Sequence, residues 1–242
     1  MGVIKAAIGD GVLTFLWVLC SSNIGVSTYL IASYFGVVNE MASLLITTHV
    51  VFLIFLVFGF LGDALGGAGF NPTGNAAFYA AGLGDDSLLS AALRCPAQVA
   101  GAVAGSLAIM EFMPRQYHHM LDGPALKVDV LTGAIAEGVL TFIITFMVFI
   151  IVLRGPESVI LKNWLLTMVT LPLVLAGSKY TGPSMNPANA FGWAYLSNTH
   201  NTWEHFYVYW VGPFTGAILA AWIFRTVFPL PVEQKPQKQK RN

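Results

Sequence analysis

The sequence has very little charge for its length. Only 10% of its 242 residues are charged, whereas a soluble domain of average composition carries about 25%. Hydrophobic residues make up 56% of the chain, and the mean hydropathy is +0.68. The formal net charge is zero, so the composition does not indicate a nucleic-acid partner. These values exclude an ordinary soluble domain and predict a protein that crosses a lipid bilayer several times.

Cysteine is also scarce, and the residue patterns typical of catalysis are missing. The two cysteines, Cys20 and Cys95, both lie in apolar segments, where a small buried side chain is expected rather than a disulfide. The sequence contains no nucleophile paired with a base, no phosphate-binding loop and no cluster with metal-ligand spacing. We therefore predict that the protein is not an enzyme and has no cofactor or bound metal.

Long apolar runs are abundant. About 20 apolar residues span a bilayer as a helix, and six runs are long enough. Two shorter apolar stretches each follow an Asn-Pro pair and are predicted to form re-entrant half-helices, which are tolerated only inside protein or beside a water-filled cavity. The expected spans are 7–30, 41–62, 88–112, 128–153, 160–178 and 205–228, and the expected half-helices are 71–82 and 186–197.

The two halves of the chain resemble each other. Residues 9–15 (GDGVLTF) are echoed 127 positions later by 136–142 (AEGVLTF). Each half has three spans, so the second half must cross the membrane in the opposite direction, which makes an inverted repeat. We expect a first repeat over 1–122, an inverted repeat over 123–228 and a basic tail over 229–242. Two further landmarks recur 115 positions apart: Asn71-Pro72 with Asn186-Pro187, and Gly101 with Gly216.

Each Asn-Pro pair is predicted to begin a helix, because Asn is a favoured N-cap and Pro is favoured at the first helical position. In an inverted repeat the two half-helices enter from opposite faces, so their N-termini meet near the middle of the bilayer. Each N-terminus carries roughly half a positive charge, which repels cations. A water held by amide donors from both Asn residues cannot also accept a proton, so proton transfer is interrupted. The predicted midplane residues are Asn71, Pro72, Thr73, Asn186, Pro187 and Ala188.

These features resemble the aquaporin (major intrinsic protein) family. The resemblance rests on the paired Asn-Pro motifs, on residues 180–182 (YTG) and on residues 209–217 (YWVGPFTGA). The first motif and residues 177–180 (GSKY) are most similar to plant small basic intrinsic proteins of type 1. The resemblance implies an all-α inverted repeat of six transmembrane helices plus two re-entrant half-helices. It also implies a channel for water or small neutral solutes, assembled as a homotetramer with one pore in each subunit.

Two positions depart from the wider family pattern. Thr73 replaces the usual alanine at the end of the first motif, and its hydroxyl is expected to bond locally or to lie near the pore. Asn189 replaces the arginine that most water-selective members carry three residues after the second motif asparagine. The expected constriction is therefore more apolar, so cation exclusion should rest on the half-helix dipoles rather than on a fixed cation. By matching positions, the resemblance places this outer constriction at Val51, Val174, Pro183 and Asn189.

A carboxylate occupies the same place in the first and fourth spans, Asp10 in one and Glu137 in the other. A carboxylate inside a membrane is costly and is usually functional or paired. One interpretation is proton coupling. The favoured interpretation is that each accepts hydrogen bonds from a loop and holds a half-helix in place. Because aspartate is one methylene shorter than glutamate, the two supports cannot have the same geometry.

The distribution of Lys and Arg predicts the orientation. With both termini in the cytosol, the inner side holds most basic residues, including Lys5, Arg94 and Arg225. The last five residues, 238–242 (KQKRN), resemble the K-x-K-x-x retrieval signal of endoplasmic-reticulum membrane proteins. The family resemblance implies the same membrane, and an ordinary basic tail is the alternative. Two rival functions stay open: a secondary transporter, and a mainly structural membrane-junction protein of low permeability.

Overall fold

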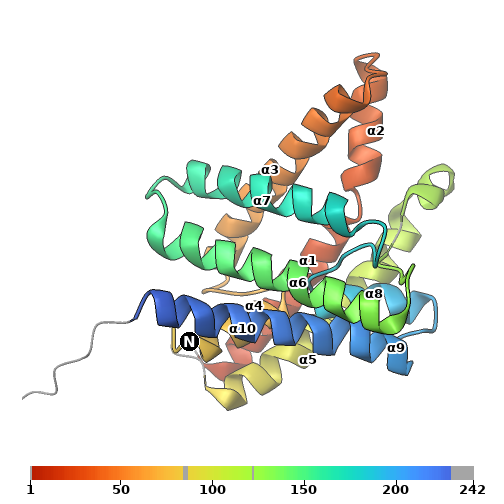
Figure 1. Cartoon of the computed structure of the whole chain (residues 1–242). Coiled ribbons are helices and arrows are strands. Elements are labelled where there is room, and N and C mark those ends of the chain that lie inside the picture. Colours follow the sequence, from red (N-terminus) through yellow and green to blue (C-terminus); the bar gives the residue numbers. More distant parts are fainter. Residues whose placement is uncertain (1, 84–86, 122, 230–242) are drawn as a thin grey trace, which may run out of the picture.

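The computed structural model describes residues 2–83, 87–121 and 123–229, and all regular structure within them is helical (Figure 1). Six helical segments are long and apolar enough to cross a membrane. The predicted all-α membrane fold with six spans is therefore confirmed, and most bounds agree with the sequence within a few residues. The segments are Val3–Tyr34, Glu40–Ala64 (α3), Leu88–Phe112 (α5), Val130–Arg154, Val159–Gly177 (α7) and Trp203–Val227.

Three of these segments are composite. The first is divided into α1 (Val3–Ser21) and α2 (Ile24–Tyr34). The fourth is α6 (Val130–Phe149), which continues into the π-helical η2 (Ile150–Arg154). The last contains α9 (Trp203–Phe206), the π-helical η3 (Tyr207–Val211) and α10 (Gly212–Val227). A short 3₁₀ helix, η1 (Arg115–Met120), follows α5.

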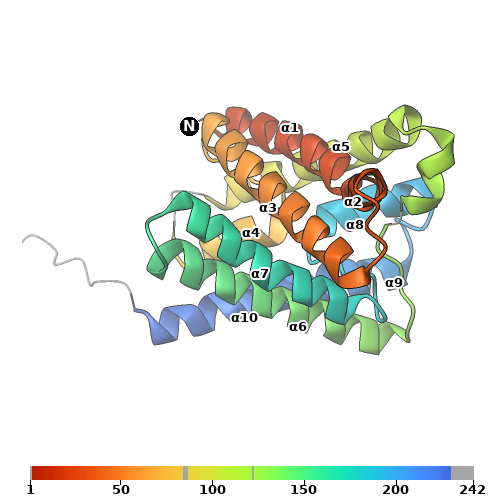
Figure 2. The same ribbon diagram turned by 90° about the horizontal axis from the view of Figure 1, so that it is seen from above.

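The break in the first span is a difference from the single helix that the sequence predicts over 7–30. The Ser22 hydroxyl donates to the Val18 carbonyl at 2.6 Å, and the Asn23 amide donates to the Leu19 carbonyl at 2.6 Å. Such side-chain bonds compete with the helical backbone pattern and bend helices. As a result α2 turns away from α1 and projects beside the first part of α3 (Figures 1 and 2). The hydroxyls of Thr28 and Thr47 join α2 to α3 at 3.1 Å.

The two predicted half-helices are present as α4 (Pro72–Ala80) and α8 (Pro187–Leu196). Both begin at the proline that follows the motif asparagine, as the sequence predicts. In Figure 2, α4 lies toward the end of the bundle that holds the N-terminus and the end of α10, and α8 lies toward the opposite end. Two short helices thus approach the middle of the bundle from its two ends.

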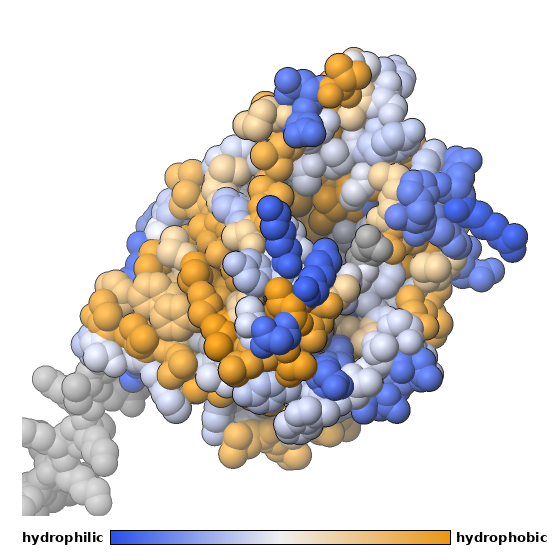
Figure 3. Space-filling model, turned by 45° about the vertical axis from the view of Figure 1, so that its right-hand side comes forward, coloured by the Kyte–Doolittle hydropathy of each residue, from blue (hydrophilic) through white to orange (hydrophobic). Residues whose placement is uncertain are grey.

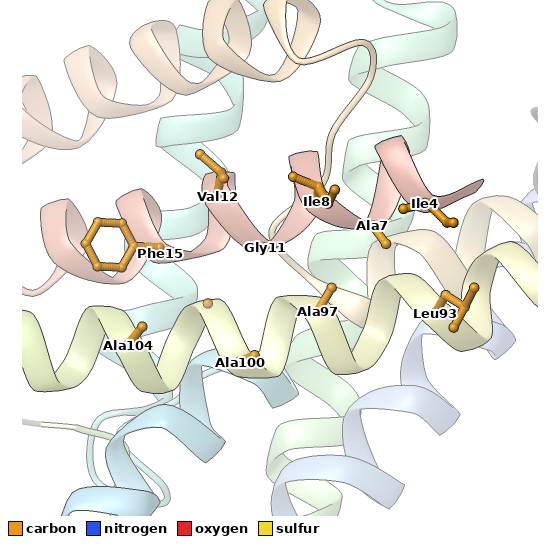
Figure 4. A pocket seen from close by; sticks show the side chains of 11 residues that line it. Ile4, Ala7, Ile8, Gly11, Val12, Phe15, Leu93, Ala97, Ala100 and Ala104 are labelled. Atoms are coloured by element: carbon orange, nitrogen blue, oxygen red, sulfur yellow. The ribbon is translucent and has the colours of Figure 1, made fainter. Parts of the chain in front are cut away.

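Close glycine contacts join the long helices in pairs. A Cβ atom on Gly101 of α5 would overlap the Gly11 carbonyl of α1, and one on Gly216 of α10 would overlap the Gly138 carbonyl of α6. These two contacts are equivalent under the repeat, and small residues at such places let helix backbones approach closely. Figure 4 shows Gly11 opposite the alanines of α5 along an open, apolar groove at the α1–α5 seam.

The outside of the bundle is apolar over a broad area. Hydrophobic residues cover the left-hand flank in Figure 3, and hydrophilic residues gather at its centre and right edge. Large exposed side chains include Val38 (96%), Tyr34 (85%) and Phe112 (75%). Such exposure is unfavourable in water and suits a lipid environment. The tail that carries the predicted retrieval signal (238–242) lies outside the described residues.

Candidate pore

The two motif asparagines cap the half-helices that they precede. The Asn71 side-chain oxygen accepts from the Thr73 backbone N–H at 3.0 Å. The Asn186 oxygen accepts from the N–H groups of Ala188 at 3.1 Å and Asn189 at 3.3 Å. Because each oxygen is used as a helix cap, each amide NH₂ group is turned away from its own helix and is available to other partners.

Each asparagine amide donates one hydrogen bond to the opposite loop. Asn71 Nδ2 donates to the Met185 carbonyl at 2.9 Å, and Asn186 Nδ2 donates to the Phe70 carbonyl at 2.9 Å. Phe70 and Met185 are equivalent positions of the repeat, so the two bonds form a symmetric cross-link between the helix starts. An amide group has two N–H donors, and each cross-link uses one of them. The structure therefore brings the predicted midplane asparagines together.

The hydroxyl of Thr73 bonds locally. It donates to the Asn71 side-chain oxygen at 2.8 Å and lies 3.5 Å from the Met185 carbonyl. The side chain is 1% exposed. Thr73 thus reinforces the N-cap of α4, and its counterpart Ala188, also buried, has no hydroxyl to do the same.

Asp10 lies at the centre of a buried polar cluster. Its carboxylate is 0% exposed and accepts five hydrogen bonds, two of them from Arg94 at 2.8 and 2.9 Å. One bond comes from the Gly69 backbone N–H at 2.8 Å and one from Asn75 of α4 at 3.1 Å. Gln98 supplies the fifth at 2.8 Å. Asp10 therefore ties α1 to α5, to the loop before the first motif and to the first half-helix.

Glu137 supports the second loop in a different way. Its carboxylate, also 0% exposed, accepts from the N–H groups of Ser184 and Met185 and from the Thr181 hydroxyl, each at 2.9 Å. Ser184 is the repeat counterpart of Gly69, so both carboxylates accept a hydrogen bond from the backbone N–H at the equivalent loop position. Met185 has a φ of 50°, a left-handed conformation that costs a non-glycine residue about 1–2 kcal/mol. Its N–H bond to Glu137 and its carbonyl bond from Asn71 hold it there.

The structure adds supporting residues that the sequence did not indicate. Arg94 was expected among the cytosolic basic residues, but it is 7% exposed and forms an ion pair with Asp10. It also donates to the Gly67 carbonyl at 3.2 Å. Tyr209, the repeat counterpart of Arg94, is uncharged, so this ion pair has no equivalent in the second half.

The predicted outer-constriction residues come from four places in the fold. Val51 is buried on α3, Val174 is 36% exposed on α7, and Pro183 lies in the loop before the second motif. Asn189 is in the first turn of α8 and donates to the Ser184 hydroxyl at 3.3 Å. Its side-chain oxygen is buried and has no hydrogen-bond partner among the described residues. Their joint role as a filter stays a prediction.

Comparisons with known proteins agree with this geometry. The family model "Major intrinsic protein" matches residues 1–224. Aquaporin SIP1-2 of Zea mays is 59% identical over 237 residues, which cover 98% of this chain and 97% of the relative. Aquaporin SIP1-1 of Arabidopsis thaliana is 52% identical over 242 residues, 99% of each chain. The X-ray structure of the aquaglyceroporin from Plasmodium falciparum superposes with a TM-score of 0.67 at 19% identity, covering 94% of this chain and 96% of that one, and supports the fold.

The match to this family extends over nearly the whole chain, and the cross-linked Asn-Pro motifs lie where two short helices meet. The earlier resemblance to the plant small basic intrinsic proteins is confirmed by relatives that are similar over almost their full length. The chain belongs to the major intrinsic protein (aquaporin) family of passive membrane channels for water or small solutes, and it is not an enzyme.

Proposed function

We propose that the protein conducts water, together with other small neutral solutes, and excludes ions and protons. The observation that carries the proposal is the symmetric pair of hydrogen bonds between the motif asparagines and the opposite loops. The bonds hold the N-termini of α4 and α8 toward one junction, and each N-terminus carries roughly half a positive charge. A neutral molecule that accepts hydrogen bonds is favoured at such a junction, and a cation is not.

Proton exclusion follows from the second N–H group of each asparagine. A water molecule at the junction accepts from Asn71 and Asn186, so its oxygen is turned toward them. Its own hydrogens then point away along the path, and it cannot receive a proton from a neighbouring water. With Asn189 at the outer constriction, exclusion of cations rests on the two helix N-termini.

The contacts of the buried carboxylates favour a channel over a secondary transporter. A proton-coupled transporter needs a carboxylate that changes partners during its cycle. Asp10 accepts five hydrogen bonds and Glu137 accepts three, all from groups that hold the loops or helices in place. Both are therefore assigned to the scaffold of the half-helices.

Stopped-flow light scattering on reconstituted vesicles tests the function. Vesicles with the protein should shrink faster than empty vesicles in an osmotic gradient, and glycerol and hydrogen peroxide should show how far permeation extends beyond water. Uphill accumulation of a solute driven by an ion gradient would establish a transporter instead. Water flux equal to that of empty vesicles would support the structural membrane-junction protein.

The role of Asn189 is tested by restoring the family arginine. Asn189→Arg should narrow the outer constriction and reduce glycerol permeability about threefold or more while water flux persists, because pore diameter and fixed charge control selectivity. Asn201→Arg makes the same change on an exposed loop and is the control. Unchanged solute selectivity in Asn189→Arg vesicles would remove Asn189 from the filter, along with the grouping of Val51, Val174 and Pro183 around it.

The family suggests the assembly and the location. We assign the protein to a homotetramer with one pore in each subunit, in the endoplasmic reticulum membrane with both termini cytosolic. The N-terminus and the end of α10 lie at the same end of the bundle, which is consistent with this orientation (Figure 1).

The double variant Lys238→Ala/Lys240→Ala should move a tagged protein from the endoplasmic reticulum to later membranes, as seen by microscopy. Retention of the variant would rule out the tail as a retrieval signal.

A further inference from the structure

A tryptophan lies beside the junction of the two half-helices. Trp17 follows Asp10 by seven residues on α1, and residues at this spacing share one helix face. The buried residues Asp10, Thr14 and Val18 identify that face as the one turned into the bundle. Trp17 itself is only partly buried, so part of its surface remains accessible although it is on the inner face.

The indole ring stacks on the residue before the first motif. Its centroid lies 4.1 Å from that of Phe70, with the rings 15° from parallel. Phe70 is the residue whose carbonyl accepts from the Asn186 amide. Trp17 also packs against the buried cluster of Val18, Ala102 and Ala188, which includes the third residue of the second motif. The indole therefore packs against the residue before the first motif and against a cluster that includes a residue of the second.

Rings from α3 fix the indole in place. Phe55 stacks on Trp17 at 5.9 Å, and Phe58 meets it edge-on at 5.3 Å. Phe58 also meets Phe70 at 5.9 Å. Aromatic pairs in such arrangements stabilise a protein beyond the effect of their buried area alone. Trp17 is thus held by three neighbours and has little freedom to swing out of the way.

The indole N–H donates no hydrogen bond within the described part of the protein. A buried tryptophan usually finds an acceptor for this group, whereas Trp17 is only partly buried and leaves it without one among the described residues. The nitrogen also keeps some accessible surface. An accessible polar atom on the inner face of α1, beside the motif junction, is expected where the indole borders a water-filled path.

The second half of the chain has no ring at the position equivalent to Trp17. The repeat counterpart of Trp17, 127 positions later, is Ile144, and the counterpart of Phe70 is Met185. The rings of Trp17 and Phe70 therefore have no aromatic counterparts at the equivalent positions of the second half. The outer constriction, by contrast, contains no aromatic side chain and no arginine.

We infer that Trp17 forms a second constriction at the middle of the membrane and that this constriction, rather than the outer one, sets the size limit for solutes. The inference rests on the pore proposed above. It names the class of substrate more closely: water and solutes small enough to pass an indole ring, with glycerol slowed and larger polyols held back.

The test compares solute and water permeability in reconstituted vesicles. Trp17→Ala should raise the ratio of glycerol to water permeability at least about fivefold, because pore diameter governs which neutral solutes pass. Trp17→Phe keeps a ring and should change the ratio by less than about twofold. Trp222→Ala removes the same side chain from the exposed face of α10, 57% exposed, and should leave the ratio unchanged.

The outcomes separate this inference from the proposed function. Wild-type vesicles with no water flux above empty ones would reject the pore itself. Normal water flux, with the same ratio of glycerol to water permeability in Trp17→Ala and Trp222→Ala, would reject only the role of Trp17. If Trp17→Ala yields no folded protein, Trp17→Leu carries the same comparison, since leucine retains apolar packing and still removes the ring.

Discussion

Gly216→Val should leave little folded protein in the membrane. The added Cβ would overlap the carbonyl oxygen of Gly138 and lie 2.9 Å from the Phe142 backbone nitrogen. Backbone atoms on both helices cannot move aside as a flexible side chain can, so α6 and α10 must separate. We expect a loss of more than about 4 kcal/mol in the free energy of unfolding, the size that severe overpacking can reach.

The repeat supplies a second test of the same packing. Gly101→Val should have a similar effect at the α1–α5 seam, where the Cβ would overlap the Gly11 carbonyl. Gly59→Val is the control, because nothing lies within 4 Å of a Cβ at Gly59 on α3. Thermal unfolding of detergent-purified protein measures all three. A Gly216→Val protein as stable as Gly59→Val would mean that the two helices do not pack as closely as described.

Arg94→Ala should lower the free energy of unfolding by about 3–5 kcal/mol, the usual effect of breaking a buried ion pair. The substitution removes two of the five hydrogen bonds to the Asp10 carboxylate and the bond to the Gly67 carbonyl. The buried charge of Asp10 is then left with neutral partners only. Water flux should fall as well, because the loop that leads to Asn71 loses one of its supports.

Two further variants separate the ion pair from a general loss of packing. Adding Asp10→Asn to Arg94→Ala removes the unpaired charge and should recover part of the lost stability. Arg115→Ala removes an exposed arginine of η1 and should change stability by less than about 0.5 kcal/mol, as is usual for surface positions. If Arg94→Ala unfolds at the same temperature as Arg115→Ala, the ion pair does not support the loop.

The overall fold follows from sequence because its signals are local. Each span is a long and mostly apolar run, and each half-helix begins at an Asn-Pro pair, so the prediction needed no knowledge of distant contacts. The symmetric placement of Gly101 and Gly216 also followed from the repeat. Both glycines lie at close contacts between helices.

The details of the site depend on contacts between distant parts of the chain. Arg94 lies near the start of a span, which suggests an interfacial position, and only its pairing with Asp10 shows that it is buried. The bend after α1 was also missed, because Ser22 and Asn23 interrupt the apolar run too briefly to suggest a break. The left-handed backbone of Met185 depends on Glu137, 48 residues earlier.

Water and proton fluxes measured together in the same vesicles test the central claim most directly. The vesicles contain a pH-sensitive dye and are exposed to an osmotic gradient in one experiment and to a pH gradient in the other. We predict water flux well above that of empty vesicles, with a proton leak equal to theirs. A proton leak that rises in step with the water flux would contradict the account, because the paired N–H groups of Asn71 and Asn186 would then not interrupt proton transfer.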